Sequence, residues 1–165
     1  ADLPPQAPPL LRERRLYQAD WLMRFYGFTH EEIIVPGTAG MLDLEVDPKL
    51  AWALAHREHF PVNLNRAPKM WLLRVPGLGV RSVQRLLAAR RVRLLRLADL
   101  QQLRVATAKV LPFVETADYH PQPATLESPQ LRQQLLTRMP TTAAQHTHSG
   151  MQLPTQAQLA QLALF

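Results

Sequence analysis

The feature that most constrains this chain is a short break, Val-Pro-Gly-Leu-Gly at positions 75–79, between two amphipathic stretches. Proline cannot continue the first stretch as a helix, and glycine permits backbone torsions that other residues avoid. Apolar residues recur at helical spacing on both sides, over about 65–75 and 81–91. The pattern therefore predicts two helices joined by a tight turn.

The rest of the ordered chain is also expected to be helical. Stretches with helical apolar spacing are 10–27, 30–34, 49–59, 97–103 and 107–114. Thr29 and Glu32 fit a capping box. Asp47 before Pro48 fits the start of a helix, and Asn65 is expected to cap the helix that precedes the break. The predicted fold class is therefore all-α.

The basic residues are concentrated in one stretch. Residues 61–114 contain 11 Lys and Arg against the single acid Asp99, whereas the whole chain has a net charge of +6. Clustered cations favour a polyanionic partner, because binding to phosphates releases condensed counterions. The alternative is a solvated helical surface with unmatched arginines.

The predicted turn has the composition of a phosphate-binding site. The backbone N–H groups at 79–81 are expected to point outward, unpaired, at the positive end of the second helix. We therefore expect nucleic-acid contacts from Gly77, Gly79, Val80, Arg81, Arg85, Arg90 and Arg91. Pro-Gly-x-Gly is also found as an ordinary helix C-cap, in which case the turn would be structural only.

The stretch 65–91 resembles the helix-hairpin-helix motif of DNA repair and recombination proteins. The resemblance implies sequence-independent DNA binding by the backbone of the turn. Residues 97–114 resemble a degenerate second copy, whose turn, Arg104-Val105-Ala106, lacks glycine. We expect this second copy to support packing rather than to bind phosphate.

A wider resemblance covers residues 3–118. The segments 10–28, 42–54 and 60–67 are similar to the C-terminal helix-hairpin-helix region of the DNA modification/repair radical SAM protein family. In those bacterial proteins a radical SAM barrel precedes this region. The resemblance implies S-adenosylmethionine and an iron–sulfur cluster as cofactors of the full-length family, and a uracil-DNA-glycosylase-like protein as a partner.

The chain departs from that family in one chemical respect, because it contains no cysteine. A cluster of this type is held by cysteine thiolates. We therefore expect no cofactor in this chain and no catalysis by it alone. Its expected function is that of the accessory DNA-binding part of such an enzyme, either truncated or separately encoded.

Composition divides the chain into four parts. Residues 1–10, with four prolines, are expected to be a linker. Residues 11–60 form a helical region that could serve as a docking surface, and 61–118 the helix-hairpin-helix DNA-binding domain. Residues 119–165 contain nine Gln, six Thr and five Pro with little charge, so this tail is expected to be disordered, with transient helices at 131–138 and 156–164.

The aromatic residues of the first helical region have two interpretations. They are Tyr17, Trp21, Phe25, Tyr26 and Phe28. At helical spacing they are expected to form core or a face that docks on a missing barrel. Stacking on bases is the alternative.

Catalytic and metal-binding interpretations have less support. Asp99 is the candidate for catalysis, because some helix-hairpin-helix glycosylases carry an aspartate at a similar spacing beyond the turn. An acid in the first turn of a helix is equally explained by the helix dipole. His56, Glu58 and His59 lie close in sequence, but two histidines without an evident third ligand are insufficient evidence for zinc.

No apolar run approaches the roughly 20 residues that span a bilayer, and the N-terminus lacks the pattern of a signal peptide. We expect a soluble cytoplasmic protein with no membrane partner. The missing initial Met suggests a fragment or a trimmed chain.

Three alternative functions remain open for this chain: a glycosylase or lyase, a structural protein-interaction domain, and binding to RNA.

Overall fold

The computed structural model describes residues 9–34 and 40–138. The first half contains α1 (Pro9–Phe25), α2 (His30–Ile33), α3 (Pro48–Ala55) and the 3₁₀ turn η1 (Arg57–His59). The second half contains β1 (Val62–Asn63), α4 (Lys69–Leu72), α5 (Val80–Val92), α6 (Leu97–Gln102), α7 (Thr107–Val110), η2 (Leu111–Phe113) and β2 (Val114–Glu115). The chain then forms α8 (Pro123–Glu127) and α9 (Leu131–Arg138).

Helices dominate the described residues, so the prediction of a mostly helical protein is confirmed. The exception is a parallel pair of two-residue strands, in which Val62 lies opposite Val114 and Asn63 opposite Glu115. Strands this short carry no periodic signal, which is why the stretch 107–114 reads as one helix in the sequence. The pair joins segments from the two ends of the basic stretch.

Two of the predicted helix starts are confirmed. The Thr29 side chain accepts the Glu32 backbone N–H, and the Glu32 carboxylate accepts the Thr29 backbone N–H. The Asp47 carboxylate accepts the Leu50 backbone N–H at 2.9 Å, with Pro48 in the first turn. Local side-chain chemistry therefore determines where α2 and α3 begin. The helix predicted to reach His59 ends at Ala55, and η1 follows it.

The predicted capping role of Asn65 is wrong. The Asn65 side chain accepts the Leu95 backbone N–H at 2.7 Å and donates to the Leu95 carbonyl at 3.1 Å. The helix begins four residues later, after Pro68. Asn65 therefore ties the segment after β1 to the segment after α5, a tertiary role that a capping pattern cannot reveal.

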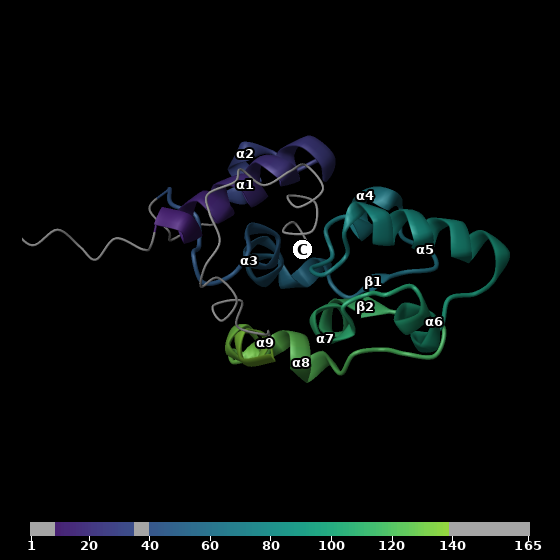
Figure 1. Cartoon of the computed structure of the whole chain (residues 1–165). Helices are drawn as coiled ribbons and strands as arrows, with labels where there is room; N and C mark the ends of the chain where they lie inside the picture. The colour runs from purple at the N-terminus through teal and green to yellow at the C-terminus, as the bar shows by residue number, and fades with distance from the viewer. Residues whose placement is uncertain (1–8, 35–39, 139–165) are drawn as a thin grey trace, which may run out of the picture.

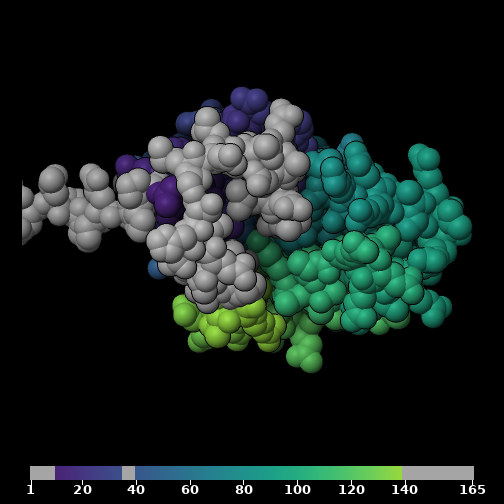
Figure 2. Space-filling model, viewed as in Figure 1, coloured from purple at the N-terminus to yellow at the C-terminus, as the bar shows by residue number. Residues whose placement is uncertain are grey.

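One hydrophobic core connects both halves of the chain. Side chains that are almost fully buried come from nearly every segment: Leu22, Tyr26, Leu50, Leu64, Leu86 and Phe113. In Figure 1, α1 and α2 lie together over α3, while α4 and α5 lie beside the strand pair. The space-filling view in Figure 2 shows the teal α4–α5 region and the green region after it as one continuous flank of the molecule.

The expectation that order ends near Asp118 is wrong for residues 119–138. Leu126, Leu131 and Leu135, on α8 and α9, are buried in the core. Composition suggested disorder because this segment is rich in Gln and Pro, yet three leucines suffice to anchor it. The rest of the predicted tail, 139–165 with its expected helix at 156–164, lies outside the described residues, as do residues 1–8 of the predicted linker.

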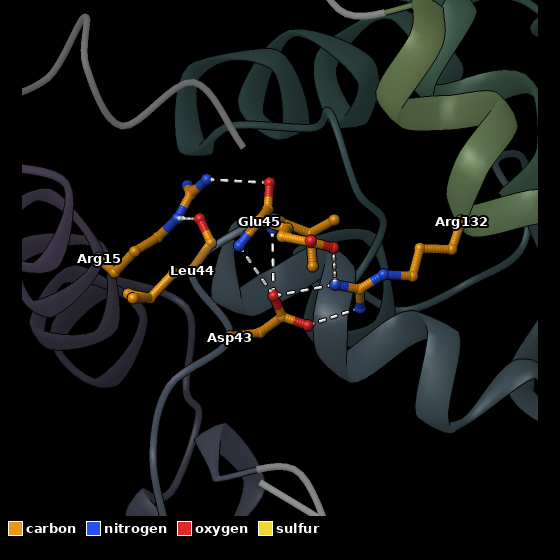
Figure 3. Close-up of polar contacts among 6 residues, drawn as sticks. Arg15, Asp43, Leu44, Glu45 and Arg132 are labelled. Carbon is orange, nitrogen blue, oxygen red and sulfur yellow. Dashed lines mark hydrogen bonds and ion pairs between the residues drawn. The ribbon is translucent and has the colours of Figure 1, made fainter. Parts of the chain in front are cut away.

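Arg132 of α9 fastens this segment to the N-terminal half. Its guanidinium contacts the Asp43 carboxylate at 2.5 and 3.1 Å and the Glu45 carboxylate at 2.8 Å. Arg15 of α1 donates from the other side to the carbonyls of Leu44 and Glu45 (Figure 3). Burial alone would raise the pKa of Asp43, but the bonds from Arg132 hold it below its ordinary value.

Candidate nucleic-acid interface

The turn at 75–79 depends on one of its two glycines. Gly77 has φ +88°, in the left-handed region, and a Cβ built there would lie 2.6 Å from the Val110 side chain. Gly79 has φ −79° and ψ 170°, which any residue adopts, and a Cβ there would meet the Tyr26 hydroxyl at an ordinary 3.6 Å. The expected need for glycine is therefore confirmed at 77 and wrong at 79.

The N-terminal half of the chain holds the turn in place. The Val80 backbone N–H donates to the Tyr26 hydroxyl at 3.3 Å. The Lys49 ammonium donates to the Leu78 carbonyl at 2.5 Å, and both Lys49 and Tyr26 are buried. The expectation of an unpaired Val80 N–H is therefore wrong, because Tyr26, directly after α1, supplies its acceptor.

The arginines of α5 divide into two groups. Arg81, Arg85 and Arg91 are exposed. Arg90 instead points back into the protein, where its guanidinium donates to the carbonyls of Leu64 at 3.3 Å and Ala67 at 2.6 Å. Since those bonds hold the segment between β1 and α4, Arg90 has a structural role and its predicted role in DNA contact is not supported.

Three other basic residues of the stretch 61–114 are neutralised. Arg74 is buried, pairs with Glu32 at 2.6 Å, and lies over the rings of Phe28 and Trp52. Lys109 pairs with Asp47 at 2.5 Å, and Arg93 pairs with Asp99 at 2.7 Å.

Seven basic residues of the stretch remain exposed. Among the described residues none of them forms an ion pair: Arg66, Lys69, Arg81, Arg85, Arg91, Arg96 and Arg104. Each would gain from an external anion, because its charge is not neutralised by any acidic side chain of residues 9–34 and 40–138. The positive charge of the stretch is thus largely available to a ligand.

The Asp99 carboxylate makes contacts that stabilise the fold. One carboxylate oxygen accepts the Arg96 backbone N–H at 2.9 Å, at the start of α6, and the other pairs with Arg93. These contacts, one from the start of α6 and one from the residue that follows α5, satisfy the carboxylate. They account for the residue without a catalytic role.

The second turn differs from the first in its geometry. Arg104 has φ +57°, and the Val105 backbone N–H donates to the Leu100 carbonyl at 3.0 Å, so α6 ends in a left-handed cap. The following helix, α7, contributes Lys109 and Val110, which pack against Gly77. Residues 107–110 therefore support the first turn.

The histidines near α3 belong to an aromatic stack. The rings of His56 and His59 lie parallel to Trp52, with centroid distances of 4.7 and 6.0 Å, and His56 Nδ1 contacts the Trp52 carbonyl. Within 9–34 and 40–138 the structure brings together no three side chains able to hold a metal.

The helices within residues 9–34 and 40–138 are all too short or too polar to span a bilayer.

The aromatic side chains of the first helical region differ in how deeply they are buried. Tyr26 and Phe28 are in the core, whereas Tyr17 is 56% and Phe25 50% exposed. Trp21 is half-buried, with its ring centroid 4.4 Å from that of Phe25. The core interpretation is thus confirmed for two of the five residues, and the exposed ones form an apolar surface on α1.

Sequence reasoning missed the residues that fix the turn. Tyr26 and Lys49 lie 54 and 29 residues from their partners, and no local pattern identifies contacts over such separations. It also did not single out Trp71, although an aromatic residue within a basic stretch is a recognisable signal of nucleic-acid binding.

Comparison of the chain with protein-family models, with curated proteins and with solved structures finds no match in any of the three.

Proposed function

We propose that this chain binds duplex DNA with little sequence preference, through cationic side chains around the α4–α5 turn. The observation that carries the proposal is the set of seven exposed basic residues that form no ion pair within the described part of the chain, in a stretch whose single acid is neutralised by Arg93. Nucleic-acid phosphates bind such a set of cations favourably, because binding releases condensed counterions. Contacts of this kind position a duplex without reading its bases.

The side chains, rather than the backbone of the turn, are the main donors in this proposal. The Val80 N–H is occupied by Tyr26, whereas Arg81 and Arg85 project from successive turns of α5. Long guanidinium side chains reach a phosphate without requiring the backbone to approach it. The turn then serves to hold the start of α5 rigidly.

We further propose that the chain is the accessory helix-hairpin-helix part of a radical SAM DNA modification/repair protein. The support is the sequence resemblance over residues 3–118 together with the turn, which joins two helices at the resembling positions. The residues present do not fit the iron–sulfur cluster of that family, because the chain has no cysteine. The cluster and S-adenosylmethionine would belong to a separate barrel.

The exposed surface of α1 supports a second proposal, docking on such a barrel or on a uracil-DNA-glycosylase-like partner. Leu10, Tyr17 and Phe25 are 79%, 56% and 50% exposed and lie on one face of the helix. Replacing Tyr17 and Phe25 by Asp should abolish co-purification with the partner and leave DNA binding intact.

DNA binding is tested by titrating the chain with two duplexes of equal length and unrelated sequence. The dissociation constants should agree within a few-fold, and the log–log salt slope should lie at about −3 to −5, as expected for four or five neutralised phosphates. A flat salt response would contradict the proposal and favour a structural interaction domain. Tighter binding to a matched RNA duplex would assign the phosphate site to RNA.

A further inference from the structure

A shallow groove opens beside α4, away from the turn. It has a volume of about 230 Å³ and is lined by His59, Val62, Asn63, Ala67 and Trp71. The imidazole of His59 and the indole of Trp71 form an aromatic wall, with ring centroids 5.0 Å apart and planes inclined by 39°. Val62 is buried and contributes to the apolar lining.

The groove is held rigidly from behind. His59 lies parallel to the buried ring of Trp52, at 4° between the planes. The Asn63 side chain accepts the Asn65 backbone N–H at 2.9 Å and donates to the Glu115 carboxylate at 3.0 Å. A ligand would therefore meet a preorganised surface, which reduces the entropy cost of binding.

The charges around the groove favour a neutral ring inside it and phosphates outside. Glu58 lies next to His59 in sequence, and Glu115 bonds to Asn63, so a phosphate inside the groove would face carboxylates. The nearest basic residue along the chain is Arg66, which directly precedes the lining residue Ala67 and is exposed, without an ion pair among the described residues. Lys69 lies two residues before Trp71 in α4 and therefore on another face of that helix.

We propose that this groove binds one unpaired nucleobase of a DNA strand, stacked against Trp71 and His59, with a flanking phosphate on Arg66. The volume suits a single base, since a cavity of roughly 150 Å³ accommodates a benzene ring. Aromatic side chains stack on any base, because every base has a π-face. The proposal rests on the proposed DNA binding and extends it to duplexes with single-stranded ends or gaps.

The test compares three fluorescent probes with the full chain: a blunt duplex, the same duplex with a short thymidine overhang, and the same duplex with an abasic overhang of equal length. The two overhangs carry equal charge and differ only in their bases. The thymidine overhang should bind about tenfold more tightly than the abasic one, the scale of one stacked base. Equal affinities would overturn the proposal.

Variants assign the preference to the groove. Trp71→Ala should remove the tenfold difference, Trp71→Phe should retain most of it, and Tyr17→Ala, an exposed aromatic on α1, should leave it unchanged. Binding to the blunt duplex should be the same in all three. A preference that survives in folded Trp71→Ala would place the base elsewhere.

A measurement without substitution covers the case in which Trp71→Ala fails to fold. Photocrosslinking of the wild-type chain to an overhang that contains 5-iodouracil should label His59 or Trp71. Labels confined to other residues would overturn the groove assignment. If no probe binds at all, the proposed DNA binding fails as well, whereas binding of all three probes with equal affinity removes only the present inference.

Discussion

The hydroxyl of Tyr26, the residue directly after α1, accepts the backbone N–H of Val80 at the start of α5, at 3.3 Å. Burial raises the pKa of Tyr26 to about 12, although the Val80 hydrogen bond acts in the opposite direction. The phenol therefore stays neutral at physiological pH. A residue far away in sequence thus occupies a donor that would otherwise be open to a phosphate.

Tyr26→Phe removes this acceptor and keeps the ring. The free energy of unfolding should fall by about 1 kcal/mol, because the Val80 N–H loses its partner. DNA affinity should stay within twofold, since arginine side chains make the contacts. Urea denaturation and DNA titration measure the two effects. A tenfold loss of affinity in the folded variant would contradict this expectation and show that DNA binding depends on the hydrogen bond from Val80 to Tyr26.

The two glycines of the turn should respond differently to the same substitution. Gly77→Ser should lower the free energy of unfolding by about 2 kcal/mol or more, because of the left-handed torsion and the clash with Val110. Gly79→Ser should be neutral or stabilising by a few tenths of a kcal/mol, since serine is a good N-cap. Thermal melts of both variants decide this, and equal losses would contradict the described turn.

Helix α9 should be essential to the fold. Leu135→Ala should cost about 2–4 kcal/mol, because Leu135 is 2% exposed and the cavity left behind collapses only partly. Gln134→Ala, one residue earlier and exposed, is the control and should have no measurable effect. If denaturation midpoints of the two variants coincide, α9 does not pack as described.

The Glu32–Arg74 pair should make stability depend on pH. The hydrogen bond from Arg74 lowers the pKa of Glu32, with burial opposing it. A lowered carboxyl pKa gives stability that is complete above the ordinary value of about 4.3 and is lost as the pH falls through the lowered value. Wild type should therefore exceed Glu32→Gln in stability at neutral pH, and the difference should shrink in acid.

Urea denaturation at about pH 7 and about pH 3 measures this difference. Other titrating groups, such as Asp47, are present in both proteins and cancel. A difference that does not change with pH would show that the pair contributes nothing through its charge.

Features set by neighbouring residues could be predicted from the sequence. The capping of α2 by Thr29, the start of α3 at Asp47 and the extent of α5 depend on local chemistry, and the structure has all three. Exposure of Arg81 and Arg85 followed equally from the apolar spacing of α5.

Features that depend on partners far away in the sequence could not be predicted. Asn65 and Arg90 look like a cap and a surface cation, yet each bonds to backbone groups brought near by the fold. The segment 119–138 looks disordered by composition, but its leucines meet a core built from the rest of the chain. Burial of Lys49 against Leu78 is equally a tertiary property.

The salt dependence of DNA binding by an α5 double variant tests the central claim most directly. Arg81→Ala with Arg85→Ala should make the log–log slope shallower by about two, because each cation neutralises about one phosphate. The control, Arg12→Ala with Arg24→Ala, removes the same charge from exposed positions on α1 and should leave the wild-type slope unchanged. An equal change in both double variants, or none in the α5 variant, would contradict the assignment of the interface to α5.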